Sequence, residues 1–207
     1  MDINRDYILE NTSYFKSKYK KKQIVIGNTA NKGMNHFDTW NKKINGKYKG
    51  TSPYTIDLSG RIYEHFDPTY YSSFVKNDKI DKKVISIVLE NEGWVTKDFN
   101  KNKYITWDGD IYNRMEPLVE RKWRNKLRWA PYSEKQMDSL AFLCDKLTDE
   151  FNIPKIVSSD NIRINEIEFK SGIFYRANYS KKFLDVSPAF NFNYLKDKIE
   201  KNNGKFK

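Results

Sequence analysis

The chain has 207 residues, enough for one domain with a sizeable core, and its formal net charge is +11. A single cysteine, Cys144, excludes an intrachain disulfide, and no apolar run approaches the roughly 18 residues that span a bilayer. The chain does not open with a charged segment followed by an apolar one, so we expect no signal peptide and synthesis in a cytoplasm.

The basic residues are spread along the chain, and their excess predicts attraction to polyanions. Anionic wall polymers and membrane surfaces are both compatible partners. No zinc-finger spacing, aromatic RNA-binding motif or basic zipper accompanies the lysines, so the sequence does not favour a nucleic-acid site. A soluble, Lys-rich surface is the simpler interpretation.

The first elements in chain order are an N-terminal helix or arm and a buried strand. Residues 1–22 carry aromatic side chains at helical spacing, which favours a helix or an arm ahead of the main domain. Residues 23–26 form a short apolar run that precedes a glycine, as is typical of a buried strand. Apolar side chains on one face of residues 35–44 predict a helix there.

A hairpin, a central strand and an insertion follow. Residues 54–58 and 61–66 flank a Ser-Gly pair, which suits a tight turn between two strands. Residues 84–89 are almost wholly apolar and β-branched, as expected of a strand covered on both faces. Residues 97–131 show no sustained period, so they predict an insertion packed on one side of the sheet.

The last part of the chain contains a long amphipathic helix that opens at residues 131–134 and ends near Asn152. Cys144 lies on its apolar stripe, which predicts a buried structural thiol rather than a nucleophile. Further strands and a closing helix are expected at residues 156–157, 172–175 and 194–199. Strands alternating with helices predict a single α/β domain, with a central mixed sheet flanked by helices.

Four short motifs occur in one order along the chain. They are Gln-Ile-Val-Ile-Gly-Asn-Thr-Ala at residues 23–30, Ile-Asp-Leu-Ser-Gly-Arg-Ile-Tyr at 56–63, Ser-Ile-Val-Leu-Glu at 86–90 and Asp-Val-Ser-Pro-Ala-Phe-Asn-Phe at 185–192. Together they resemble type-2 N-acetylmuramoyl-L-alanine amidases, the fold of phage amidase endolysins and peptidoglycan recognition proteins. The resemblance implies an amidase-like domain over residues 23–207, with the insertion at about 97–131.

The resemblance also implies a metal site. In the family, two His and an Asp or Cys hold zinc, which activates a water and polarises the lactyl amide carbonyl. Asp185 matches the acidic ligand, while Asn28 and Tyr175 stand at the positions of the two missing His; a one-residue shift would place Arg176 second. Because neutral Asn and un-ionised Tyr are poor zinc ligands, we expect no cofactor, or zinc if the protein is active.

A catalytic carboxylate and a substrate groove are further implications. Glu90 matches a glutamate that some members place near the water, although a strand-edge carboxylate paired with a lysine is the alternative. Three residues are candidates for the groove: Tyr54, His65 and Lys182. The two histidines of the chain, His36 and His65, do not fall at the family's ligand positions.

Three functions follow from these patterns. The first is a catalytically impaired amidase-fold protein of phage origin that binds peptidoglycan or serves as a structural module of a virion. The second is an active N-acetylmuramoyl-L-alanine amidase that cleaves the lactyl-L-Ala amide at a divergent metal site. The third is a basic scaffold that binds polyanions. Peptidoglycan, an anionic wall polymer and other virion proteins are the expected partners. We expect synthesis in a bacterial host cytoplasm, then association with virions or release to the cell wall at lysis.

Overall fold

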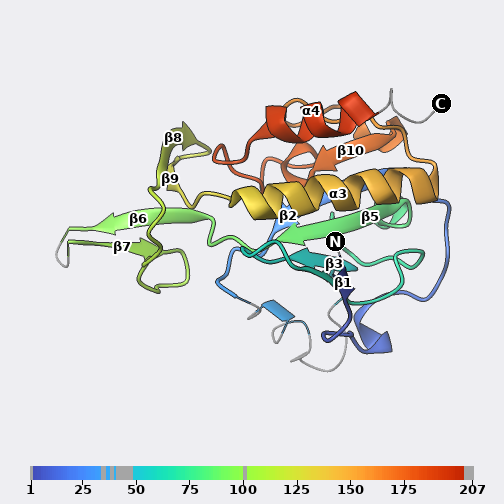
Figure 1. Ribbon diagram of the computed structural model, residues 1–207, viewed down its shortest axis with the longest axis horizontal. Helices are drawn as coiled ribbons and strands as arrows, with labels where there is room; N and C mark the ends of the chain where they lie inside the picture. Colours follow the sequence, from blue (N-terminus) through green and yellow to red (C-terminus); the bar gives the residue numbers. More distant parts are fainter. Residues whose placement is uncertain (1, 34–35, 38–39, 41–48, 100–101, 203–207) are drawn as a thin grey trace.

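The computed structural model of the chain describes residues 2–33, 36–37, 40, 49–99 and 102–202. They form a six-stranded mixed sheet, a separate four-stranded antiparallel sheet, and two long helices on one face of the larger sheet (Figure 1). This arrangement confirms the predicted α/β class with a mixed central sheet flanked by helices. The expected helix over residues 35–44 lies mostly outside the described residues.

Parallel strands form the centre of the larger sheet, whose order is β1-β4-β3-β5-β2-β10. β2 (Gln23–Asn28) and β5 (Val84–Leu89) pair in parallel and are buried along their whole length. β10 (Gly172–Tyr175) pairs in parallel with β2, and β3 (Tyr54–Ile56) with β5. Strands covered on both faces must be almost continuously apolar, which explains why β2 and β5 are visible in the sequence.

The hairpin and the N-terminal arm complete one edge of this sheet. β4 (Ile62–Glu64) runs antiparallel to β3, and the turn between them uses Gly60 at a φ of +86°. A Cβ atom at Gly60 would lie 2.7 Å from the carbonyl oxygen of Lys135. The turn therefore requires glycine both for its positive φ and for lack of space. Residues 2–22 are mostly extended; they contain β1 (Ile3–Asn4), which pairs with β4, and the short 3-10 helix η1 (Asn11–Ser13).

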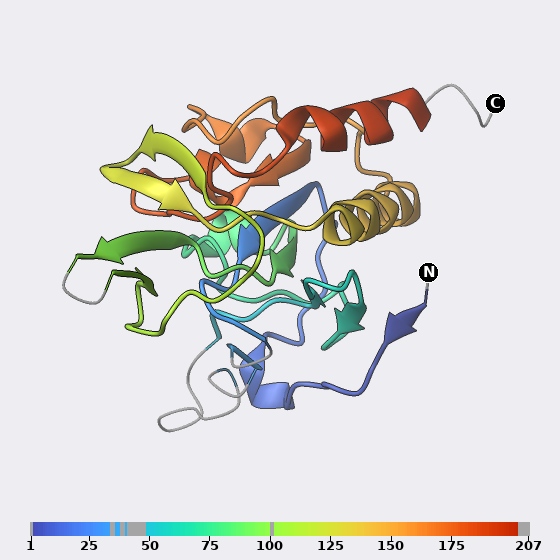
Figure 2. The same ribbon diagram turned by 60° about the vertical axis from the view of Figure 1, so that its left-hand side comes forward.

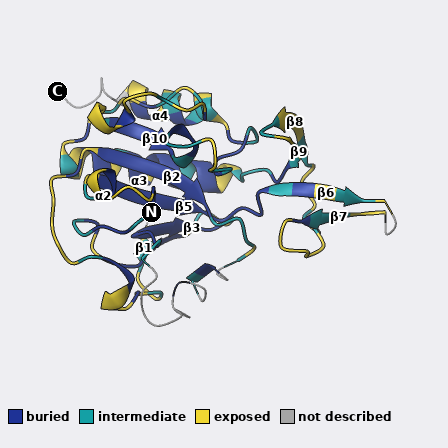
Figure 3. Cartoon of the chain, turned by 180° about the vertical axis from the view of Figure 1, so that it is seen from behind, coloured by how far each residue is buried: buried dark blue, intermediate teal, exposed yellow. Residues whose placement is uncertain are grey.

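Helices and the arm cover opposite faces of the sheet. α3 (Glu134–Phe151) and α4 (Phe192–Asn202) bury their apolar stripes on one face, and Cys144 is fully buried there. Burial raises the pKa of the Cys144 thiol, which disfavours a reactive thiolate. The short helix α2 (Asp78–Asp81) precedes β5 near the other face, where central strands are buried as well (Figure 3). Among the residues described, no helix is long and apolar enough to cross a membrane.

The insertion is a folded sheet with the strand order β7-β6-β9-β8. It projects from one end of the larger sheet (Figure 1). Its strands are β6 (Trp94–Asp98), β7 (Lys103–Thr106), β8 (Val119–Trp123) and β9 (Lys126–Trp129). The fully buried Trp129 anchors this sheet, and its indole N–H donates to the carbonyl of Arg121.

Candidate functional site

The carboxyl ends of β2, β5 and β10 lie at one edge of the sheet, which is where open parallel sheets bind ligands. Asn28 ends β2 and Tyr175 ends β10, while Glu90 directly follows β5. Asp185 reaches the same edge from the loop that follows η4 (Arg176–Asn178). All four candidate residues of the sequence therefore start from this edge, and their side-chain directions decide which of them meet.

Asp185 is held by an arginine and by the backbone. Its side chain is almost buried, and its Oδ2 accepts a hydrogen bond of 2.9 Å from Nη1 of Arg176. Burial raises the pKa of Asp185, while the Arg176 guanidinium, a backbone hydrogen bond from Asn28 and the charge of Arg124 oppose that rise. The carboxylate is thus engaged with cations and donors of the chain itself.

Arg176 is fixed between two aromatic rings. Its guanidinium carbon lies 4.8 Å from the ring centroid of Phe74 and 4.2 Å from that of Phe183. Its Nε donates to the Phe74 carbonyl at 2.9 Å. A side chain at Gly27 would meet the Phe74 ring at 2.8 Å and Cδ of Arg176 at 3.6 Å. Arg176 therefore passes over the bare backbone of Gly27, on the face of β2 that looks towards Asp185.

The side chain of Asn28 faces away from this pair. Alternate residues of a strand point to opposite faces, so Asn28 shares the face of Ile26 rather than that of Gly27. Its Nδ2 lies 3.5 Å from the hydroxyl of Tyr132, which packs edge-on against Phe190. Only the backbone of Asn28 reaches Asp185.

Tyr175 is also directed away from Asp185. It is fully buried on the helix-covered face, with its ring 5.3 Å from that of Phe190 and 4.9 Å from that of Phe192. Its hydroxyl has no hydrogen-bond partner among the described residues, and burial raises the pKa of this phenol well above its ordinary value. Of the two registers that the sequence allowed, the structure brings Arg176 rather than Tyr175 to the acidic residue.

These residues do not fit a zinc ion. Zinc sites in proteins use three or four N, S or O donors around an electron-poor metal. Beside Asp185 lie Gly27, which has no side chain, and the Arg176 guanidinium, which has no lone pair to donate to a metal. The Asp185 carboxylate itself is already in an ion pair. No cluster of three or more His, Cys, Asp or Glu that could hold a metal occurs in the described part of the chain.

Glu90 has a structural role at the same edge. Its Oε1 accepts from the backbone N–H of Gly33 at 2.5 Å, and its Oε2 accepts from that of Leu58 at 3.0 Å. These bonds tie together the loops that follow β2 and β3, so both carboxylate oxygens are engaged. The partners of Glu90 are backbone amides instead of the lysine that the sequence suggested as an alternative.

Of the three expected groove residues, the structure places only Lys182 beside Asp185. Lys182 and Asp185 line a cavity of about 530 Å³ at the edge of the sheet. Tyr54 is buried, and its hydroxyl donates to Glu64 at 3.3 Å. His65 is fully buried and contacts the Thr55 hydroxyl and the Tyr7 carbonyl, because the arm covers the end of β4.

The insertion holds the loop that carries Asp185. Arg124, in the turn between β8 and β9, donates to the carbonyl groups of Ala177, Ser180 and Phe183. Figure 2 shows this hairpin beside the orange and red segment that follows β10. Nothing in the sequence indicates this contact, since the partner of one arginine among many charges in a region without periodicity cannot be predicted.

Comparison with known proteins gives a family and a fold. The sequence model of the N-acetylmuramoyl-L-alanine amidase family matches residues 17–166, which ends before Arg176 and Asp185. Among curated proteins, no sequence matches.

Three solved structures illustrate the likeness of fold. The amidase LysC from Clostridium intestinale URNW is 14% identical, with 97% of this chain and 98% of that chain covered and a TM-score of 0.56. A mutant endolysin from Bacillus subtilis is 17% identical, with 96% and 98% covered and a TM-score of 0.54. AmiD from E. coli, solved with anhydro-N-acetylmuramic acid-L-Ala-D-gamma-Glu-L-Lys, is 15% identical, with 88% and 59% covered and a TM-score of 0.54. Since the family match spans most of the chain and the fold agrees with it, this protein belongs to the N-acetylmuramoyl-L-alanine amidase family.

Proposed function

We propose that this chain is an amidase-fold protein that binds peptidoglycan without hydrolysing it. The observation that carries the proposal is the ion pair of Arg176 with Asp185, at the place where the family resemblance implies zinc. A zinc ion and the Arg176 guanidinium would each neutralise the same buried carboxylate, that of Asp185, with a positive charge. The guanidinium supplies that charge permanently, and it leaves Asp185 no free role as a metal ligand.

The arginine cannot replace the chemistry of the metal. A guanidinium offers N–H donors but no vacant orbital and no lone pair, and it stays protonated, so it can neither lower the pKa of a water as a metal ion does nor take a proton from it. Glu90, the candidate base, has both oxygens bound to backbone N–H groups. These features support a site without an activated nucleophile.

Binding of wall material is supported by the fold and by the cavity beside Arg176. The related AmiD structure holds a muropeptide, and we infer the same class of ligand for this chain. The cavity of about 530 Å³ has the size of a small-ligand site and contains aromatic and cationic side chains. We further propose a phage origin with release to the cell wall at lysis, which the likeness to endolysin structures supports.

The alternative is an active amidase with a metal at Asp185. It would require Arg176 to leave its carboxylate and both aromatic rings, and the vacated space holds no imidazole. The structure offers no observation that favours this alternative, and the third candidate, a polyanion scaffold, rests on the net charge of +11 alone.

Co-sedimentation with insoluble peptidoglycan, together with metal analysis of the purified chain, tests the proposal. We expect the protein to pellet with the wall material equally with and without a chelator, and to contain far less than one zinc per chain. Stoichiometric zinc, or binding that disappears with the chelator, would overturn it.

A further inference from the structure

The cavity beside Arg176 lies between the two sheets. The insertion contributes Trp94 and Trp107, and the loop after β10 contributes Arg176, Lys182 and Phe183. Neither sheet encloses this space alone. The insertion, whose sequence gave no functional prediction, therefore forms one wall of the candidate site.

The tryptophan wall is held in place but remains accessible. The indole N–H of Trp107 donates to the carbonyl of Ala30, just beyond β2. The rings of Trp94 and Trp107 lie 6.1 Å apart at 38°, and Nζ of Lys126 lies 4.7 Å over the Trp94 ring. Even so, Trp107 is 49% exposed. The exposed face of this fixed indole is apolar surface in contact with water, and a ring-shaped ligand that stacks on it would bury that surface favourably.

Cations outnumber acids around this wall. Lys76, Lys182 and Arg176 line the cavity together with a single carboxylate, that of Asp185. Asp185 is already paired with Arg176. Lys76 and Lys182 are exposed, and within the described ranges neither takes part in an ion pair. Two lysines are thus left to receive an anionic group.

We propose that this cavity binds a muramoyl saccharide through a free carboxylate, with the sugar ring on Trp94 and Trp107 and the carboxylate at Lys76 and Lys182. The inference rests on the proposed function for its ligand class and adds the requirement for a charge. A carboxylate can be borne by the lactyl group once the peptide is gone, or by the peptide itself. In the intact lactyl amide the lactyl group is neutral and the carboxylate stands on the peptide, farther from the sugar ring, so the position of the charge distinguishes the two forms.

Titration of the full chain with three soluble sugars tests this pocket, with tryptophan fluorescence as the signal. N-acetylmuramic acid carries the lactyl carboxylate. N-acetylmuramoyl-L-alanine has an amide in that place and carries a carboxylate on its alanine instead. N-acetylglucosamine carries no carboxylate. We expect one or both muramoyl sugars to bind about tenfold more tightly than N-acetylglucosamine, and added salt to weaken that binding. The preferred muramoyl sugar identifies which carboxylate the lysines receive.

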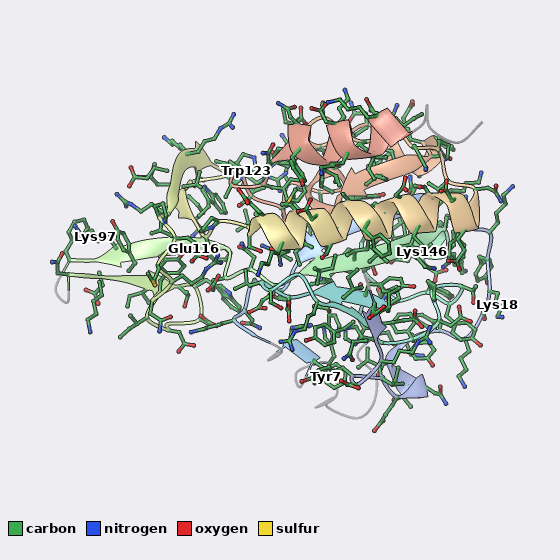
Figure 4. The ribbon with its side chains drawn as sticks, viewed as in Figure 1. Tyr7, Lys18, Lys97, Glu116, Trp123 and Lys146 are labelled. Atoms are coloured by element: carbon green, nitrogen blue, oxygen red, sulfur yellow. The ribbon has the colours of Figure 1, made fainter. Side chains whose placement is uncertain are left out.

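Two variants locate the binding, and each has a matched control. Trp107→Ala and Lys182→Glu should each weaken muramoyl binding about tenfold, since one removes a stacking surface and the other reverses a charge. Phe99→Ala, at an exposed position directly after β6, and Lys146→Glu should leave it unchanged. Figure 4 shows Lys146 on α3, at the far side of the molecule from Lys97 and the insertion. Lys182 is exposed, so its variant is expected to fold.

The outcomes separate this inference from the function it rests on. Equal affinity for all three sugars, or unchanged affinity in both cavity variants, would overturn the pocket even if the protein still sediments with peptidoglycan. Loss of sedimentation would instead remove the proposed function, whatever the soluble sugars do.

Discussion

At the scale of single residues, the pairing of Gly27 with Arg176 defines this site. The bare Gly27 gives Arg176 room to cross β2 and reach Asp185, with its guanidinium between Phe74 and Phe183. Replacement of either residue alone would disturb the site: a side chain at position 27 collides with the Phe74 ring, and a shorter side chain at position 176 leaves the buried Asp185 carboxylate unpaired.

Two imidazoles at these positions should create a zinc site. In Gly27→His with Arg176→His, loss of the guanidinium that packs on Phe74 lets this ring move away from the new side chain at position 27, and both imidazoles start beside Asp185. We expect the double variant to bind zinc at about one ion per chain, as measured by calorimetric titration.

The matched control is Asn28→His with Tyr175→His. These side chains point to Tyr132 and into the helix-covered core, so the control should gain no zinc affinity. A zinc site in the control but not in the first variant would reverse our assignment of the faces.

A buried pair of histidines makes stability depend on pH. His65 Nδ1 contacts the Tyr7 carbonyl, so it carries the proton, and its Nε2 accepts from the Thr55 hydroxyl. The Thr55 oxygen then accepts from Nε2 of His36. Burial lowers the pKa of His65 to about 4 and that of His36 to about 3. Both rings are therefore neutral in the folded protein.

Protonation of the unfolded chain should destabilise the fold as pH falls. Unfolded histidines bind protons below a pKa of about 6.5, whereas the folded ones resist down to about 4. The free energy of unfolding should therefore fall from about pH 6.5 towards pH 4, by about 1.4 kcal/mol per pH unit for each histidine. Urea unfolding at several pH values measures this slope.

His65→Gln is the reference for that slope. Asp81 acts in the opposite direction, because burial raises its pKa to about 6 and the folded state then takes up a proton first. The difference between the two proteins cancels this contribution. A slope that is the same in His65→Gln and in the unaltered chain would contradict the buried neutral pair.

How far the sequence predicts the site depends on strand register. Asp185 is recognisable from its motif, and the structure does place it at the edge of the sheet. Its partner was ambiguous between Tyr175 and Arg176, because adjacent residues at the end of a strand point to opposite faces. Glu90, His65 and Tyr54 show the same limit, since spacing locates their strands but not the groups that their side chains meet.

At the scale of elements, strands buried on both faces could be predicted and the strands of the insertion could not. β2 contains the apolar run of residues 24–26, and β5 is apolar except for Ser86. β8 and β9 are rich in charge, and the turn between them consists of Arg124 and Asn125, both at positive φ. This pair lacks the glycine that usually marks such a turn in a sequence. Their register is further interrupted by an irregularity between Glu120 and Trp123.

The contact between the insertion and the site loop can be tested through Arg124. Arg124→Ala removes the charged donor to three carbonyl groups in residues 177–183, and we expect a loss of about 2 kcal/mol in the free energy of unfolding. Amide hydrogen exchange in this loop should accelerate as well. Arg121→Ala, an exposed position on the same hairpin, is the control. Equal effects of the two variants would argue against the contact.

At the scale of the whole molecule, an amidase fold is combined with a strongly basic composition and with a site in which Arg176 pairs with the carboxylate that the family resemblance assigns to zinc. The net charge of +11 suits an anionic wall, and the insertion adds a tryptophan wall to the family's sheet edge. Under the proposed function, the fold and its ligand class are kept while hydrolysis is lost, because binding surfaces and the metal site depend on different residues.

The most direct measurement is mass spectrometry of stem peptides released from purified peptidoglycan in the presence of added zinc. A catalytically active family member serves as the positive control. We predict that this chain sediments with the peptidoglycan and releases no stem peptide above the level of a protein-free sample. Release of stem peptides together with free lactyl groups would contradict the account.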